Sequence, residues 1–210
     1  MNPFNQFLLK NILRLNNFSY HLASFLALRR EKGKHPKHRL TQYHQFFLNN
    51  ISNNDRVIDI GCGQGFLAFD LAQKSKFVFG IDIDKKNIEK AVQKYQKDNL
   101  KFQEADLFSL QTKERFDVAV LSNVLEHIEK REEFLTKIKE LALKILIRVP
   151  MENRDWISLY KKELGIEYRL DKGHFIEYTL ESFQKEMNQA NLKINNYSIQ
   201  FGEIWAVVYD

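Results

Sequence analysis

A short apolar strand that runs directly into a glycine-rich turn, at residues 56–65, constrains the fold more than any other stretch of the chain. Val57, Ile58 and Ile60 form a β-branched run, which is typical of a strand covered on both faces of a sheet. Three glycines at alternate positions follow, and glycine lets the backbone turn tightly and approach a ligand closely. Asp59 stands inside the apolar run, where an unpaired carboxylate costs free energy. The stretch therefore predicts a buried strand that ends at a binding site for a ligand or a cation.

Strands and helices alternate along the chain after this turn. The spacing predicts strands at 56–61, 76–82, 100–105, 116–121 and 144–149, separated by helices that include 65–74, 85–97 and 124–143. A final helix is expected at 179–190, followed by two strands within 191–209 that a short turn must make antiparallel. The pattern predicts an α/β fold: a doubly wound, mostly parallel, seven-stranded Rossmann-like sheet with antiparallel C-terminal strands.

The glycine spacing excludes two common nucleotide sites. A dinucleotide fingerprint needs a third glycine at the sixth position, where this chain has Phe66. No GxxxxGK[ST] stretch is present, which excludes a P-loop. Ligands of doubly wound sheets bind beyond the carboxyl ends of the strands. Polar side chains stand at four of these expected ends, which indicates one shared site: Asp59, Asp82, Asp106, and Ser122 with Asn123.

The strand-end segments resemble the successive motifs of class I S-adenosylmethionine-dependent methyltransferases, in the family's order. They are residues 59–65, 80–82, 104–106 and 121–128, and the resemblance covers about residues 40–210. It implies S-adenosylmethionine as the cofactor and S-adenosylhomocysteine as the product. It also implies methyl transfer to an oxygen or nitrogen of a small molecule, such as a sugar, a lipid precursor or a secondary metabolite.

The same resemblance implies roles for individual residues around the cofactor. Asp59 would lie near the cofactor's ammonium group, and Asp82 would accept hydrogen bonds from both ribose hydroxyls, a bidentate role that suits a carboxylate. Asp106 would accept from the adenine amino group. The expected cofactor-binding residues are Asp59, Gly61, Cys62, Gly63, Gly65, Asp82, Ile83, Asp106, Leu107, Ser122 and Asn123.

Methyl transfer needs a close, aligned nucleophile and little water, and it needs a general base only for a hydroxyl or a protonated amine. His127 and His174 are the candidate catalytic residues. An insertion expected at 151–178 contains the candidate substrate contacts Arg154, Trp156, Glu177 and Tyr178. No metal is expected, although some relatives that methylate hydroxyls hold a divalent cation with Glu and His after the fourth strand. Such a set could come from Glu126, His127, His174 and Glu177.

Apolar residues recur at helical spacing through residues 3–30, and Asn16 with Asn17 is a candidate break between two helices. We expect residues 1–39 to form a helical cap and connector on a methyltransferase domain at 40–210. A membrane-surface helix or a dimerisation helix, and hence a homodimer, is the alternative. Arg39, Tyr43 or His44 could close over the carboxylate end of the cofactor.

Bulk properties narrow the class of protein further. The single cysteine, the dispersed net charge of +5 and the absence of a signal-like or spanning segment favour a cytoplasmic protein without a membrane span. A small-molecule acceptor is expected, and nucleic acid is not. Two alternatives stay open, namely an RNA or protein methyltransferase and a non-catalytic cofactor-binding subunit.

Overall fold

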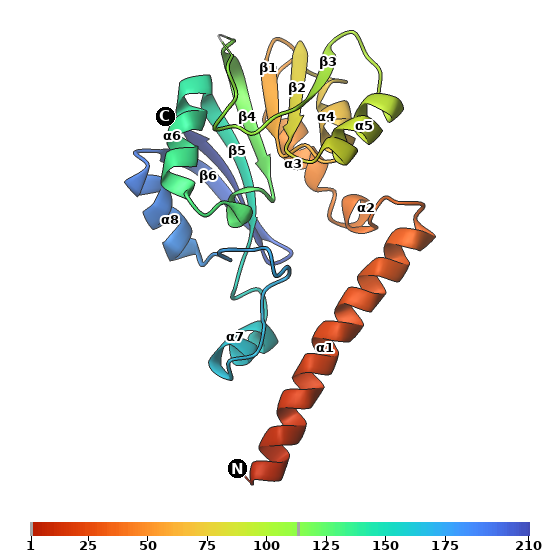
Figure 1. The fold of residues 1–210 in the computed structure, drawn as a ribbon. Coiled ribbons are helices and arrows are strands. Elements are labelled where there is room, and N and C mark those ends of the chain that lie inside the picture. Colours follow the sequence, from red (N-terminus) through yellow and green to blue (C-terminus); the bar gives the residue numbers. More distant parts are fainter. Residues whose placement is uncertain (1, 113) are drawn as a thin grey trace.

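A computed structural model describes residues 2–112 and 114–210 and contains one seven-stranded sheet with the order β3-β2-β1-β4-β5-β7-β6. The strands are β1 (Arg56–Ile60), β2 (Phe77–Asp82), β3 (Leu100–Glu104), β4 (Phe116–Ser122), β5 (Ala142–Pro150), β6 (Lys193–Gln200) and β7 (Glu203–Tyr209). Strands from β3 across to β5 run parallel, while β7 is antiparallel to both β5 and β6. This confirms the predicted fold class (Figure 1).

Helices cover both faces of the sheet, so its central strands are buried on two sides (Figure 1). One layer holds α3 (Tyr43–Asn49), α4 (Phe66–Leu71) and α5 (Lys85–Lys94), and the other holds α6 (Arg131–Leu141) and α8 (Leu180–Gln189). Thr179 caps α8 in a reciprocal pair with Ser182, where the sequence predicts the final helix to begin. Two apolar layers result, and the polar strand ends remain at one edge of the sheet.

Two predicted helices differ from the structure. The segment expected to form a single helix over 124–143 contains a 3₁₀ turn, η1 (Leu125–His127), before α6 begins. The backbone carbonyl of Glu126 accepts a hydrogen bond from the Phe175 N–H at 2.8 Å. The insertion at 151–178 therefore contacts the backbone at the position where the first turn of the predicted helix would lie. Apolar residues at helical spacing over 40–51 predict a second helix. The structure divides this region into α2 (Lys37–Thr41) and α3, because Gln42 has a left-handed φ of 50°.

The N-terminal segment is one continuous helix, α1 (Pro3–Arg30), so the expected break at Asn16 and Asn17 is wrong. Both asparagines instead accept hydrogen bonds at 2.7 Å from Lys161, in α7 (Trp156–Glu163). Leu13 is the one buried residue of this helix, which extends away from the sheet (Figure 1). The expected N-terminal helix is thus present, and the expected boundary at 39–40 falls within α2.

Candidate active site

A cavity of about 550 Å³ lies at the carboxyl ends of β1, β2, β3 and β4. That volume is within the usual range for small-molecule sites. The cavity wall brings together seven of the residues that the sequence singles out: Gly61, Asp82, Ile83, Asp106, Leu107, Asn123 and His127. The fold therefore gathers the strand-end residues around one space large enough for a nucleoside-sized ligand.

The glycine turn after β1 is held by contacts that other residues would disturb. A Cβ on Gly61 would lie 2.7 Å from Val124 Cγ2, and a Cβ on Gly65 would lie 2.7 Å from Phe102 Cζ. A Cβ on Gly63 would have no neighbouring atom within 4 Å, so this part of the turn faces open space. Its N–H donates to Asp82 Oδ2 at 2.8 Å, which ties the turn to the end of β2.

Asp82 organises the backbone and still has capacity to bind a ligand. Its Oδ1 accepts from the Asp84 N–H at 2.8 Å, while Asp84 itself caps α5 through the Lys86 N–H. Asn87 Nδ2 also donates to Oδ1, at a longer 3.4 Å. Since each carboxylate oxygen has two lone pairs, one lone pair of Asp82 is free, and the one that Asn87 occupies at this distance is held only weakly. Asp106 is exposed at the cavity, with Oδ1 accepting from the Phe108 N–H at 3.0 Å. Two acceptors thus stand at neighbouring strand ends.

Asp59 lies beneath the turn rather than on the cavity wall. Its side chain is buried, and Oδ2 has no hydrogen-bond partner among residues 2–112 and 114–210. Burial, together with the nearby carboxylate of Asp82, raises the pKa of Asp59 to about 8. A buried carboxylate oxygen without a partner is costly unless a ligand's positive or donor group satisfies it. This atom therefore fits the ammonium end of the implied cofactor.

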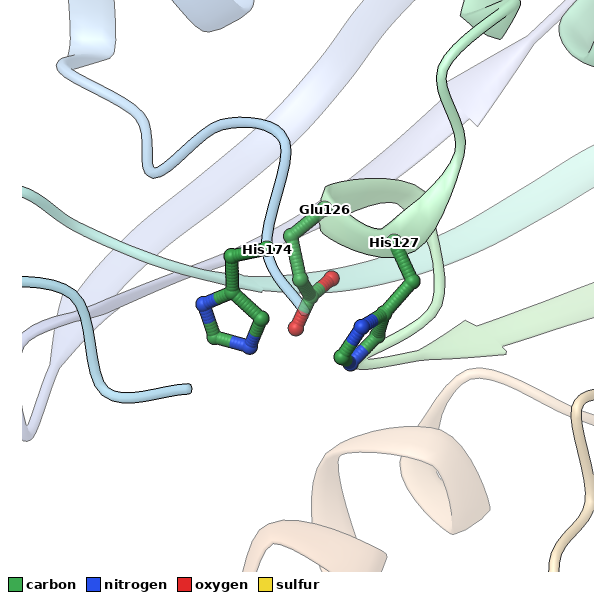
Figure 2. A group of neighbouring side chains, drawn as sticks. All are labelled: Glu126, His127 and His174. Atoms are coloured by element: carbon green, nitrogen blue, oxygen red, sulfur yellow. The ribbon is translucent and has the colours of Figure 1, made fainter. Parts of the chain in front are cut away.

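Glu126, His127 and His174 form a compact cluster (Figure 2), and His127 also lines the cavity. One donor atom from each residue lies within 4.8 Å of the other two. Glu126 is buried; its Oε1 accepts from Asn123 Nδ2 at 2.8 Å, and its Oε2 has no partner in the described part of the chain. Burial raises the pKa of Glu126 to about 7. The cluster thus presents a carboxylate oxygen and two imidazoles to one point.

Contacts behind the cluster orient both histidines. His174 Nδ1 lies 3.0 Å from Glu177 Oε1, and His127 Nδ1 lies 3.3 Å from the Gly173 carbonyl oxygen. Donation from Nδ1 in each ring leaves Nε2 as the free lone-pair atom. Histidines that bind metal ions commonly donate their other ring N–H to a carboxylate or a carbonyl in this way. The three side chains therefore suit a divalent cation, a role that the sequence leaves as a secondary possibility.

The four candidate substrate contacts lie in different environments. Tyr178 is fully buried and its O–H donates to Glu186, so the expectation of a substrate contact is wrong and the residue belongs to the core. Arg154 pairs with the buried carboxylate of Glu177, which places both behind His174 rather than on the cavity wall. Trp156 is 71% exposed at the start of α7 and is not one of the residues that line the cavity.

Several residues near the site are engaged elsewhere. Ser122 Oγ accepts from Arg148 at 3.3 Å, and Arg148 also pairs with Glu203 through two contacts of 2.6 Å. The Arg148 guanidinium lies 3.8 Å from the ring centroid of Tyr43, so Tyr43 supports this buried pair. Arg39 instead is exposed and pairs with Glu31. His44 Nδ1 lies 2.6 Å from Asp70 Oδ2.

Aromatic and aliphatic residues that sequence reasoning missed complete the cavity wall. They are Phe108, Ile128, Phe134 and Phe175. Apolar residues of this kind carry no motif, and the position of Phe175 beside His174 is the only local signal that marked one of them. Together they make one end of the cavity suited to an apolar or aromatic group.

Comparisons with known proteins agree with this geometry. A family model described as a methyltransferase domain matches residues 51–158. The chain is 32% identical to the ubiquinone biosynthesis O-methyltransferase of Rickettsia felis over 174 residues, covering 77% of this chain and 67% of that protein. The protein of the same name from Pelagibacter ubique is 30% identical over 151 residues, covering 70% and 63%. The chain thus spans about two thirds of the length of these relatives.

Solved structures support the fold. Magnesium protoporphyrin IX methyltransferase from Synechocystis, with bound SAH, aligns with a TM-score of 0.66 at 18% identity and covers 93% of this chain and 98% of that one. The N-methyltransferase NodS from Bradyrhizobium japonicum, in complex with S-adenosyl-L-homocysteine, aligns with a TM-score of 0.59 at 15% identity, covering 83% and 86%. Both neighbours hold the demethylated cofactor.

Proposed function

The chain belongs to the class I S-adenosylmethionine-dependent methyltransferases, and from this premise we propose that it methylates a hydroxyl oxygen of a small aromatic molecule. The observation that carries the proposal is the Glu126–His127–His174 cluster beside the cavity, because activation of the acceptor matters for a hydroxyl and not for a neutral amine. The names of the relatives support oxygen as the acceptor atom.

S-adenosylmethionine is the cofactor, and the cavity offers it complementary groups. In the proposed arrangement the ribose hydroxyls donate to Asp82, the adenine lies between Asp106 and Leu107, and the ammonium group satisfies Asp59 Oδ2. His127 lines the same cavity as Asp82 and Asp106, so the reactive methyl group would lie toward the cluster.

The acceptor must lose a proton during the reaction. An oxygen–carbon bond forms as the carbon–sulfur bond of the sulfonium breaks, S-adenosylhomocysteine leaves, and the hydroxyl proton is released. A phenolic hydroxyl has a pKa of about 10, so it is mostly protonated at neutral pH. We propose that Glu126 Oε2 and the two Nε2 atoms would hold a divalent cation, which would lower the pKa of an adjacent hydroxyl. His127 and His174 then act as ligands, in place of the base role and metal-free site expected from the sequence.

Radiolabelled methyl transfer to a panel of catechols, hydroxybenzoates and small amines tests this function. We expect methyl ethers from the phenols, loss of activity with EDTA and recovery with a divalent cation. Glu126→Gln should abolish turnover while S-adenosylhomocysteine still binds, and Glu129→Gln, which alters the cavity wall outside the cluster, should remain active. Labelling of amines alone would refute O-methylation, and full activity in EDTA would refute the cation.

The same assay on a fractionated cell extract separates this function from the two alternatives. Label in RNA or protein would favour a macromolecular acceptor. S-adenosylhomocysteine binding without transfer to any fraction would favour a non-catalytic subunit.

A further inference from the structure

The helix α1 carries a continuous apolar stripe that the rest of the chain does not cover. Nine side chains repeat at intervals of three and four residues, and each is at least 45% exposed: Phe4, Phe7, Leu8, Ile12, Leu15, Phe18, Leu22, Phe25 and Leu26. At 3.6 residues per turn they occupy an arc of about 140°, interrupted by Asn11 and Ser19, and extend for about 33 Å along the axis. A monomeric protein rarely exposes so long an apolar surface without a partner.

The stripe points away from the protein. The contacts of α1 with the rest of the described chain include Leu13, which is buried, Asn16 and Asn17, which bind Lys161, and Ser24, whose Oγ lies 3.0 Å from His35 Nε2. At 100° per residue these positions centre on the side of the helix opposite the apolar stripe. The attachment of α1 to α7 therefore fixes the stripe outward.

The charge of α1 identifies what covers the stripe. Residues 2–30 contain no aspartate or glutamate, and their basic residues are Lys10, Arg14, Arg29 and Arg30. Lys10 and Arg14 lie along one edge of the stripe, Arg30 lies at the other edge, and the Arg29 guanidinium lies 4.5 Å from the ring centroid of Phe25. A second copy of α1 would bring two such positive helices together with no acidic partner. An anionic surface complements them.

We propose that α1 lies in the plane of an anionic lipid surface, with its apolar stripe inserted at the boundary between headgroups and acyl chains. Long basic side chains at the edges of such a stripe reach the headgroups while their methylenes stay in the apolar layer. Within the described residues, no helix is long and apolar enough to cross a membrane. The helix thus attaches the methyltransferase to a lipid surface, and this binding is independent of which acceptor the active site takes.

Vesicle flotation of the full chain tests the proposal. We expect binding to phosphatidylcholine vesicles that contain phosphatidylglycerol, and at least tenfold weaker binding to pure phosphatidylcholine or in high salt. Leu15→Glu/Leu22→Glu should reduce binding at least tenfold. The control Gln6→Glu/Ala23→Glu makes the same charge change at exposed positions outside the stripe, and it should retain most binding. Titration with S-adenosylhomocysteine checks that both variants fold.

Three outcomes would overturn the proposal. They are no binding to either vesicle, equal binding to neutral and anionic vesicles, and equal loss in the stripe and control variants. A second copy of the chain would cover the stripe instead if two results came together. Light scattering would show a dimer that Leu15→Glu/Leu22→Glu converts to a monomer, and neither form would bind vesicles. Reduced binding of Lys10→Gln/Arg14→Gln to anionic vesicles supports the electrostatic part of the proposal.

Discussion

Asp59 should make cofactor binding strongly dependent on pH. Its carboxylate is buried, Oδ2 has no partner in the part of the chain described, and burial followed by the nearby charge of Asp82 raises its pKa to about 8. The free protein therefore holds this group mostly protonated at pH 7. If the cofactor's ammonium group pairs with ionised Asp59, binding must release that proton.

The size of the effect follows from the pKa. With a pKa near 8, about a tenth of Asp59 is ionised at pH 7 and about a hundredth at pH 6, whereas most of it is ionised at pH 8.5. The affinity for S-adenosylhomocysteine should therefore fall by one to two orders of magnitude between pH 8.5 and pH 6, and about 0.9 proton should be released per ligand at pH 7.

Isothermal titration calorimetry in buffers of different ionisation enthalpy measures both quantities. Asp59→Asn should remove the proton release and flatten the pH profile, while Asp106→Asn should lower the affinity and retain both. The stability of the ligand-free protein gives an independent check. Because the folded pKa is raised, the folded state binds more protons than the unfolded state, so the contribution of Asp59 to stability declines from about pH 4 to about pH 8. An affinity that does not change between pH 6 and pH 8.5 would refute the role of Asp59.

Four further single substitutions and one double variant test the site and its support. Asp82→Ala should weaken S-adenosylhomocysteine binding by about 10-fold to about 150-fold in calorimetry, since a hydrogen bond to a charged group is worth about 1.5–3 kcal/mol. The control Asp84→Ala should cost only about 1 kcal/mol of stability, as a lost helix cap. Gly65→Ala should destabilise the fold by about 2–4 kcal/mol in urea unfolding, because φ is +77° and the added methyl would lie 2.7 Å from an aromatic ring. Arg148→Met should cost about 3–5 kcal/mol in the same assay by leaving Glu203 without its partner, and Arg148→Met/Glu203→Gln should recover part of that loss.

The sheet was predictable from the sequence because its strands are short apolar runs that end at glycine, proline or an acid. The predicted bounds of β1 and β2 lie within one residue of the bounds in the structure. The predicted start of the helix over 124–143 does not match the structure, because the first turn is displaced by the backbone contact between Glu126 and Phe175. That contact joins residues far apart in the chain, and local periodicity carries no information about it.

The same distinction applies to the site. Acids at strand ends could be found because the topology of the sheet brings those ends together, which is true of Asp82 and Asp106. The pairing of Arg148 could not be predicted from the sequence, because its partner Glu203 is 55 residues away on β7. The two residues are close only because β7 lies beside β5. In the insertion, the sequence does not distinguish a charged residue that contacts the substrate from one that forms an internal ion pair. Glu177 forms an internal ion pair, with Arg154.

The insertion at 151–178 connects the two proposals and allows them to be tested together. Its Lys161 holds α1 through Asn16 and Asn17, and its His174 reaches the cluster beside the cavity. Release of α1 should therefore impair delivery of a membrane-dissolved acceptor without changing the chemistry. Lys161→Met should lower turnover of an alkylated phenol in anionic vesicles and leave turnover of a water-soluble phenol unchanged. Equal losses on both acceptors would show that Lys161 supports the active site itself, because a detached helix cannot affect an acceptor that arrives from water.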